Sequence, residues 1–485
     1  SDQRLGYPDG SSDSADCLYL RRWCSAVDHR NLSIVPQTAC EAAKTGLYRR
    51  RRPEAGSPGW RTSLNLIRKY GSNNMARSTR PVKLTVEMIK EARKRLLNSI
   101  YYSPCPKSQT LSDIAGCHVY CKLENLQMTG SFKERGALSR LKTLTAEEKE
   151  RGVIAASAGN HAQGIAYHAA RLGIACTIVM PEYTPLIKVV NTRRSGANVI
   201  VQGNNYDAAC EYALQLQKEN GCVFIHPFND PEVMAGQGTI GLEILEQVTD
   251  VDAVIVPVGG GGLIAGVATA IKETRPEVKV IGVQSMCVPS MKASLEENEL
   301  VCVRPEGRTI ADGIAVQVPG DLTFPIIRQY VDEIVTADED EIANAILLLL
   351  EIEKAVVEGA GAIPLAALLN RQLGLSGKKV VLLLTGGNID VNMLSVIIHR
   401  GLVRDGRLVR LRVLLRDKPG TLAELSSLLA EEHANVLEIT HHRTFTSAAL
   451  GEAEVDLDLE TEGAAHVQRI MARLEQAGYP SQRVE

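Results

Sequence analysis

The clearest chemical signal in the sequence is a run of glycines at residues 259–262. The apolar stretch VIVPV precedes it, and the helical pattern LIAGVATAIKE follows. Glycines let successive backbone N–H groups close around a phosphate, and the positive N-terminal end of the following helix adds attraction. Flexible linkers also use glycine runs, but a linker between a buried strand and an apolar helix would disrupt packing. We therefore favour a phosphate-binding turn.

A second turn between a strand and a helix is polar. The segment GVIAAS runs into Ser157, Ala158, Gly159, Asn160 and His161. This turn offers N–H groups, a hydroxyl and an amide to an anion such as a carboxylate, although an ordinary capped turn fits equally well. Neither His161 nor His168 has an acidic or metal partner recognisable in the sequence. We expect both to be packed or capping side chains.

Two more residues gain a chemical meaning only beside a cofactor. Lys133, in TGSFKERGA, resembles any solvated lysine near a helix start, but a lysine amine forms a Schiff base with carbonyl cofactors. Thr385 ends the apolar run KKVVLLLT. A hydroxyl there is often satisfied by the backbone, yet beside a bound heterocycle it could bond a ring nitrogen. The residues alone leave both alternatives open.

Alternating strand and helix patterns must position these four loops. The β-branched runs between about residues 115 and 395 are HVYCKL, GVIAAS, ACTIVMP, NVIVQG, FIHPF, DAVIVPV, KVIGVQ, EIVTA and KKVVLLLT. Helical stretches between them predict α/β domains with parallel sheets, which bind ligands beyond the carboxyl ends of their strands. Globular structure begins at VEMIKEARKRLL, with Thr85 as the expected N-cap.

Length and composition exclude several classes of partner. The chain has 485 residues, 45% of them hydrophobic, and a net charge of −3, so we expect two to four domains and neither nucleic acid nor a membrane as partner. No apolar run approaches the ~20 residues of a membrane span. The 11 cysteines form no paired C-x-x-C sets, and Cys117 and Cys121 suit a strand core. A soluble, cytoplasmic protein with reduced thiols is expected.

The two ends of the chain differ from its middle. Residues 1–74 lack a sustained apolar period and contain an arginine run at residues 49–52, so we predict a disordered extension. A targeting segment and an upstream extension of a protein starting at Met75 remain alternatives. After about residue 405 the patterns predict β-α-β-β-α, with residues 404–406 as a turn or linker.

Six segments of the sequence, in their order and spacing, closely resemble those of the fold-type II pyridoxal-phosphate enzymes of the threonine dehydratase and serine racemase group. They are SFKERGA, SAGNHAQG, AGQGT, VPVGGGGL, TIADGIAV and LTGGNID. The resemblance covers about residues 80–400. It implies pyridoxal 5′-phosphate as cofactor and an α/β fold of two open twisted parallel-sheet domains. We place the catalytic domain at residues 75–403, with a small subdomain at about 155–229 inserted in the large one.

The resemblance also implies roles for individual residues. Lys133 would hold the cofactor covalently and act as catalytic base, and Asn160 and Thr385 would bond the ring hydroxyl and the ring nitrogen. The other cofactor-binding residues would be Phe132, Gly259, Gly260, Gly261, Gly262, Leu263 and Glu358. The substrate carboxylate would lie among Ser157, Ala158, Gly159, Asn160 and His161. Glu358 stands in VEGAGA, where relatives often have EPAGA, which leaves the geometry of that loop open.

Two departures separate dehydratases from racemases. In the racemases a serine that works as a second acid/base stands where this chain has Ala158, so racemisation is disfavoured. Racemases and some serine dehydratases also bind a divalent cation through acids after a strand. The matching stretch, residues 282–290, offers Gln284 and Ser290 instead of carboxylates, so we predict no metal site.

The C-terminal module, residues 407–485, resembles an ACT domain, a small α+β ferredoxin-like fold that senses amino acids. RDKPGTL at residues 416–422 carries this resemblance, together with Asn435 at the second strand. An amino-acid effector would contact Gly420, Thr421, Leu422 and Asn435, because the free N–H groups of a helix start can receive a carboxylate. A module that only dimerises is the alternative.

The resemblance implies β-elimination of L-threonine, with L-serine as a poorer substrate, to 2-oxobutanoate or pyruvate and ammonia. This reaction serves isoleucine biosynthesis or threonine catabolism. A serine racemase or serine dehydratase, a β-replacement enzyme and an inert amino-acid sensor remain rivals. One methyl group is worth only about 1–3 kcal/mol of discrimination, so the substrate preference stays open. We expect a homo-oligomer, either dimer or tetramer, and the sequence does not identify the effector.

Overall fold

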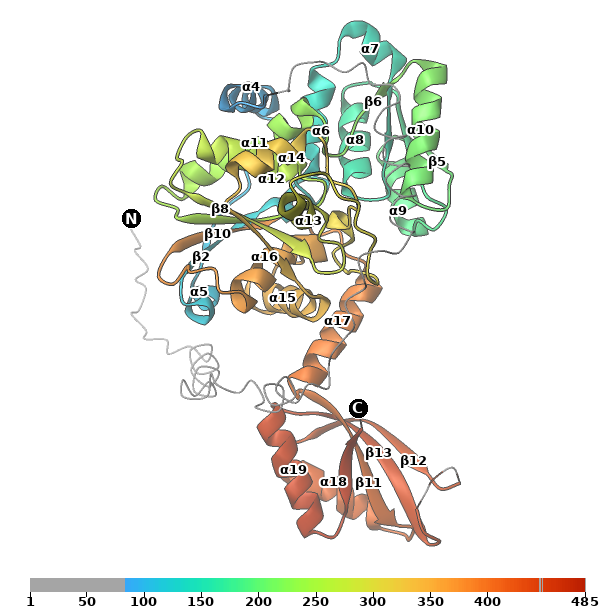
Figure 1. The fold of residues 1–485 in the computed structure, drawn as a ribbon. Coiled ribbons are helices and arrows are strands. Elements are labelled where there is room, and N and C mark those ends of the chain that lie inside the picture. Colours follow the sequence, from blue (N-terminus) through green and yellow to red (C-terminus); the bar gives the residue numbers. More distant parts are fainter. Residues whose placement is uncertain (1–82, 445, 447, 485) are drawn as a thin grey trace, which may run out of the picture. The chain divides into compact units, whose positions relative to one another are not determined.

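The computed structural model describes residues 83–444, 446 and 448–484 (Figure 1). The extension predicted at residues 1–74 lies outside them. A larger parallel sheet, a smaller parallel sheet and a C-terminal antiparallel sheet organise the described chain. Within the described part, no helix is both long enough and apolar enough to cross a bilayer.

The larger sheet carries most of the predicted strands. Its order is β1 (Lys107–Ser108), β2 (His118–Leu123), β10 (Lys379–Leu384), β7 (Ala253–Pro257), β8 (Lys279–Ser285) and β9 (Glu333–Ala337). Only β1 runs antiparallel to its neighbour, and the other pairs are parallel. The carboxyl ends of β10 and β7 therefore lie side by side, which brings the chain after Leu384 close to the glycine run.

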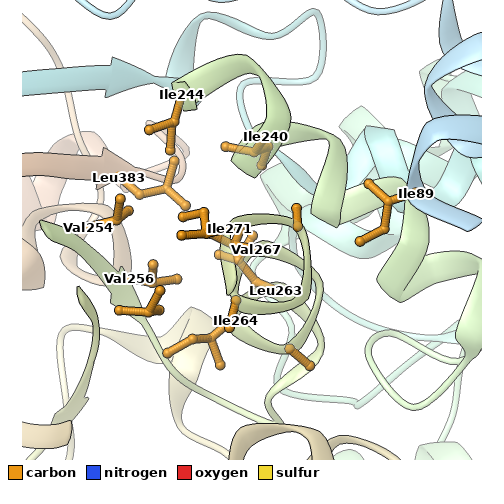
Figure 2. Packing of buried hydrophobic residues seen from close by; sticks show 14 of the residues in the cluster. Ile89, Ile240, Ile244, Val254, Val256, Leu263, Ile264, Val267, Ile271 and Leu383 are labelled. Atoms are coloured by element: carbon orange, nitrogen blue, oxygen red, sulfur yellow. The ribbon is translucent and has the colours of Figure 1, made fainter. Parts of the chain in front are cut away.

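Helices cover both faces of this sheet. One face carries α4 (Val86–Leu96), α11 (Pro231–Gln247), α12 (Gly262–Lys272) and α14 (Thr323–Tyr330), and the other carries α5 (Gln109–Ala115), α15 (Glu339–Ile352) and α16 (Gly359–Asn370). Alternation along β7 divides its apolar run between the two cores. Val254 and Val256 face α12 (Figure 2), whereas Ile255 belongs to the core with α16. The Thr85 hydroxyl accepts from Met88 N–H, so the predicted N-cap of α4 is confirmed.

The smaller sheet has the order β5 (Asn198–Val201), β4 (Cys176–Met180), β3 (Val153–Ala156) and β6 (Val223–Phe224), all parallel. Its helices are α8 (Asn160–Arg171), α9 (Leu186–Arg194) and α10 (Tyr206–Asn220), while α6 (Lys133–Lys142) and α7 (Ala146–Arg151) lead into β3. The segment FIHPF, residues 224–228, was predicted to be a strand, but β6 already ends at Phe224. Pro227 has no N–H for a sheet ladder, so the chain turns away before it.

The C-terminal module forms one antiparallel sheet with two helices. Its elements are β11 (Leu408–Arg416), α18 (Thr421–Glu431), β12 (Asn435–His442), β13 (Glu452–Glu460), α19 (Ala464–Gln476) and β14 (Ser481–Val484), with strand order β12-β13-β11-β14. The predicted β-α-β-β-α pattern is confirmed, and β14 adds a short strand. Buried residues alternate along β11 and β13, which gives the sheet one core face.

In the two lobes that the parallel sheets form, four more elements follow strands of the larger sheet: one comes after β2, two lie between β8 and β9, and α17 follows β10. They are η1 (Glu124–Leu126), α13 (Ser290–Glu297), η2 (Asp312–Ile314) and α17 (Val391–Arg404). The segment η2 belongs to the predicted TIADGIAV stretch, and α9 of the smaller lobe contacts it through an ion pair. The predicted domain bounds, residues 75–403, 155–229 and 407–485, remain predictions.

Candidate active site

The lysine-bearing loop lies against the end of β10. Ser131 forms an antiparallel bridge with Gly386, and the Phe132 N–H donates to the Thr385 carbonyl oxygen at 3.0 Å. The Gly387 N–H donates to the Gly130 carbonyl at 2.9 Å. Because α6 begins at Lys133, these bonds fix the lysine at the carboxyl end of the larger sheet. Two loops separated by more than 250 residues thus form one wall, as the predicted parallel sheet requires.

The Lys133 amine is half-buried and does not reach out to solvent as a lone surface lysine would. Its Nζ donates to the Pro227 carbonyl oxygen at 3.0 Å and lies 5.3 Å from the centre of the Phe132 ring. Burial lowers the pKa of Lys133 to about 8, although the nearby Glu358 carboxylate opposes this shift. An amine with this pKa is about one-tenth unprotonated at pH 7, a far larger fraction than for an ordinary lysine, and the unprotonated form is the nucleophile and base.

A chain of amide and carboxylate groups lies beside the lysine-bearing loop. The Asn160 amide donates to Glu358 Oε1 at 2.7 Å, and Asn388 Nδ2 donates to Asn160 Oδ1 at 2.8 Å. The Glu358 N–H donates to the Gly386 carbonyl at 2.9 Å. Burial raises the pKa of Glu358 to about 7, and the charge of Asp312 adds to the effect. Asn388 lies within the predicted LTGGNID segment, but no local sequence pattern assigns it this bridging position.

The glycine run connects β7 to α12 in a conformation that only glycine suits. Gly261 has φ +97°, and a Cβ on Gly260 would lie 2.4 Å from the Phe228 ring. The Gly260 carbonyl accepts from Thr323 Oγ1 at 2.7 Å, which turns the peptide so that its oxygen points into the protein. No side chain caps α12, and Leu263 in its first turn is buried. The first-turn N–H groups are therefore suited to an anion such as a phosphate.

The first turn of α8 has the same character. Gly159 precedes the helix without a side-chain cap, and its N–H donates to Ser157 Oγ at 3.2 Å. His161 Nε2 lies 3.0 Å from the Ile225 carbonyl, an acceptor, so this nitrogen carries the proton. Burial lowers the pKa of His161 to about 3, which leaves Nδ1 an unpartnered acceptor. The imidazole has no donor for a carboxylate, so only the backbone of His161 can serve one.

The second histidine of α8 does have an acidic neighbour. His168 Nε2 lies 3.6 Å from Glu134 Oε2 in the interior, a separation too long for a good hydrogen bond. Glu134 accepts instead from the N–H groups of Met128 and Thr129, at 3.1 and 3.2 Å. His168 is packed, as predicted, and Glu134 orders the loop before Lys133.

An ion pair joins the two lobes beside these groups. Lys188 Nζ on α9 lies 3.3 Å from Asp312 Oδ2 on η2. The charges of both residues act on Glu358, Asp312 raising and Lys188 lowering its pKa. No sequence pattern indicates this pair, because 124 residues separate its members.

The predicted effector residues lie in the C-terminal module. Gly420, with φ +96°, precedes α18 without a side-chain cap, and Leu422 on the first turn is 40% exposed. Thr421 Oγ1 donates to the Lys418 carbonyl at 3.2 Å, and the Asn435 amide donates to Glu460 at 2.9 Å. The helix start can receive an anion, whereas the Asn435 amide is already engaged.

The stretch expected to lack a metal site shows polar contacts of its own. Gln284 Oε1 accepts from the Lys292 N–H at 2.9 Å, and Ser290 Oγ donates to the Val316 carbonyl at 2.5 Å. Across the described residues, no three histidine, cysteine, aspartate or glutamate side chains gather as metal ligands. The described cysteines, among them Cys117 and Cys121, are free thiols.

Comparison with known proteins defines the class that this fold and site belong to. Residues 96–386 match the family of pyridoxal-phosphate dependent enzymes, and residues 409–478 match the ACT domain. The chain belongs to the pyridoxal-phosphate dependent enzyme family and carries an ACT domain.

Individual relatives narrow this class. An L-threonine ammonia-lyase of Thermotoga maritima is 53% identical over 82% of this chain and 98% of its own length. The solved structure of processed threonine deaminase isoform 2 from Solanum lycopersicum is 38% identical with a TM-score of 0.62, covering 64% of this chain and 87% of that one. Serine racemase from Dictyostelium discoideum is 38% identical with a TM-score of 0.60, covering 64% and 99%.

Proposed function

We propose that this chain is an L-threonine ammonia-lyase that converts L-threonine to 2-oxobutanoate and ammonia, and L-serine to pyruvate. The named relatives support the substrate and the reaction. The observation that carries the proposal is the half-buried Lys133 amine, with its lowered pKa, at the edge where the glycine turn and the Asn160–Glu358 pair also lie. That combination suits a covalently held aldehyde cofactor with a phosphate.

The residues present fit pyridoxal phosphate. We assign Lys133 to its covalent link, Phe132 to the adjoining wall and Thr385 to its ring nitrogen. Asn160, fixed by Glu358, would bond the ring hydroxyl. Gly259, Gly260, Gly261, Gly262 and Leu263 would hold the phosphate by backbone N–H groups. The close packing of Phe228 against Gly260 supports this role, because a Cβ on Gly260 would collide with the Phe228 ring and shift the turn.

When bound, pyridoxal phosphate supplies an electron sink for the pair left at the substrate Cα. The uncapped N–H groups at the start of α8, with Ser157, hold the substrate carboxylate. The Lys133 amine, with its pKa near 8, accepts the Cα proton. The protonated Lys133 amine can pass this proton to the departing β-hydroxyl, which leaves as water, and a further water converts the released enamine to the 2-oxo acid and ammonia. The side chains of Ala158 and the neutral His161 offer no second acid that could return a proton to the opposite face of Cα.

Assay of the purified holoenzyme tests the proposed reaction. We expect 2-oxobutanoate from L-threonine and pyruvate from L-serine, with a higher kcat/KM for L-threonine. The preference should stay within about 200-fold, since a single methyl group distinguishes the substrates. Released 2-oxo acid is measured by its hydrazone or by coupled reduction. Holoenzyme that releases 2-oxo acid from neither substrate would refute the proposal.

Serine racemase is the second candidate, favoured by the structural similarity to the Dictyostelium enzyme. The position of Ala158 distinguishes the two, because alanine cannot return a proton to the opposite face of the substrate. We expect D-serine to form far more slowly than pyruvate from L-serine. Ala158→Ser should raise D-serine formation, with Ala158→Gly as the matched control that adds no hydroxyl. Chiral chromatography of the products measures both, and D-serine in excess over pyruvate in the unmodified enzyme would replace the lyase assignment.

The inter-lobe ion pair is expected to keep the two lobes in contact and so to favour substrate binding. Lys188→Gln should raise KM for L-threonine about two- to fivefold with little change in kcat, because partly exposed pairs contribute up to about 1 kcal/mol. The control is Lys218→Gln, on the exposed surface of α10. Steady-state kinetics of Lys188→Gln, Asp312→Asn and the double variant measure the coupling. If the two single effects multiply fully in the double variant, the pair has no such role.

The ACT domain suggests binding of an amino-acid effector, and we propose that it contacts Gly420, Thr421 and Leu422 at the start of α18. Asn435, the fourth predicted effector residue, pairs with Glu460 at the other end of the sheet and is not part of this contact. Equilibrium dialysis with isoleucine and valine, followed by the same assay on Gly420→Ala, tests the site.

We further propose a homo-oligomer acting in the cytoplasm. The free thiols of the described cysteines suit a reducing compartment.

A further inference from the structure

The segment that follows β6, Ile225 to Asn229, contacts the start of α8, Lys133 and the glycine turn. The Ile225 carbonyl accepts from His161, and the Pro227 carbonyl accepts from Lys133. The Phe228 ring occupies the space where a side chain on Gly260 would have to lie. Asn229 Oδ1 accepts from the Leu322 N–H at 3.0 Å. The conformation of these five residues therefore sets the positions of the lysine and of the glycine turn together.

His226 holds this segment in its turn. Its Nδ1 lies 3.2 Å from the Phe228 N–H and 2.8 Å from the Asn229 N–H, so a single ring nitrogen accepts from both. Its ring also packs edge-on against Phe228, with 4.5 Å between the centroids. A nitrogen that faces two N–H donors cannot itself carry a proton. The geometry therefore fixes the neutral tautomer with the proton on Nε2.

We propose that His226 is a positioning residue for Lys133 and the glycine turn, acting through the hydrogen bonds that its Nδ1 accepts from the backbone of Phe228 and Asn229. This inference rests on the proposed lyase function. Loss of the Nδ1 acceptor would leave two backbone donors without a partner and free the turn to open. Pro227 would then no longer hold the Lys133 amine, and Phe228 would no longer support Gly260.

The environment of His226 keeps this acceptor available. Burial lowers the pKa of His226 to about 4, and the charge of Lys133 lowers it further, against a smaller opposing effect of Asp321. The ring therefore stays neutral in the pH range in which the Lys133 amine titrates. The role of His226 is to order the loop, and no proton transfer by this residue is required.

Two substitutions separate the acceptor of His226 from its ring. His226→Asn keeps an acceptor, because an asparagine carbonyl commonly accepts from N–H groups two and three residues onward, but it removes the ring. His226→Phe keeps the ring contact with Phe228 and removes the acceptor. We expect His226→Phe to lose about tenfold or more in kcat/KM with a weaker visible band of bound cofactor, while His226→Asn stays within about threefold of the parent.

The readouts distinguish positioning from a general loss of structure. Both variants are assayed as holoenzymes for 2-oxobutanoate release and cofactor absorbance, and their melting temperatures are compared. An active His226→Phe, or a His226→Asn as impaired as His226→Phe, would overturn the proposal. An inactive parent enzyme would instead refute the proposed lyase function.

Nitrogen NMR of the unmodified holoenzyme tests the same inference without relying on either variant to fold. Selective ¹⁵N-histidine labelling, with His226 assigned by the signal missing in any soluble substitution at this position, reports the tautomer. We expect a proton on Nε2 and none on Nδ1 between pH 6 and about 9. A protonated Nδ1 in this range would overturn the proposal.

Discussion

Lys133→Ala is expected to abolish release of 2-oxobutanoate and to remove the visible absorbance band of the holoenzyme near about 410 nm. The substitution deletes both the covalent attachment point and the base that we assign to the Cα proton. General-base contributions alone amount to about 10²–10⁴-fold, so a loss of at least about 10³-fold is expected. Absorbance spectra after incubation with excess pyridoxal phosphate, and single-turnover assays, measure the two effects.

The folded structure should survive this change. Lys133 contributes one bond through its amine, to Pro227, while the Ser131–Gly386 bridge and the Phe132–Thr385 bond hold the loop through the backbone. The matched control is Lys94→Ala, an exposed lysine in α4 that should leave both spectrum and activity unchanged. Borohydride reduction followed by peptide mapping should label Lys133 in the parent protein. A visible band that persists in Lys133→Ala would contradict the assigned attachment.

The sequence predicted best those strands along which apolar residues run without interruption. Strands such as Ala253–Pro257 and Lys379–Leu384 are buried on both faces, so their continuous apolar runs could be recognised without knowledge of their neighbours. The short strand Ser481–Val484 could not, because polar side chains fill it and only its backbone pairing with β11 defines it. The end of FIHPF was misassigned for a different reason: Pro227 cannot join a sheet ladder, and the His226 ring accepts hydrogen bonds from the backbone of the turn that follows.

In the candidate site, too, contacts between residues distant in the sequence could not be predicted. Lys133 and the glycine turn stand in local segments whose residue types suggest their chemistry. Asn388 bonds Asn160 across 228 residues of sequence, and no local pattern announces such a contact. His161 illustrates a different difficulty: its position at the helix start was predicted, but its bond to Ile225 decides that the ring cannot donate to a carboxylate.

A buried group of four charges behind Lys133 was not predicted at all. Arg135, two residues along α6, donates to Glu124 at 2.7 and 2.8 Å and to Glu243 at 2.6 and 2.9 Å. Lys122 Nζ also lies 2.6 Å from Glu243. The side chains are at most 7% exposed, and their formal charges cancel. Burial lowers the pKa of Arg135, but the two carboxylates outweigh it and hold that pKa above its usual value.

Arg135→Met is expected to lower the free energy of unfolding by about 3–5 kcal/mol, because it leaves Glu124 charged and buried without a cation. Urea unfolding followed by circular dichroism measures this change. Lys94→Met, which breaks an exposed pair with Glu91, serves as control and should cost less than about 1 kcal/mol. If Arg135→Met lowers the free energy of unfolding by less than about 1 kcal/mol, the buried group is not required for stability.

The double variant Arg135→Met with Glu124→Gln separates charge from packing. It removes one charge of each sign and leaves Lys122 paired with Glu243, so it should be more stable than Arg135→Met alone, with a coupling of about 0.5–3 kcal/mol. Activity need not return with stability, because α6 begins at Lys133 and Arg135 joins its first turn to Glu124 and to α11. A stable but slow double variant would show that these bonds also position the lysine. Recovery of both properties would instead mean that the other contacts of α6 suffice to position it.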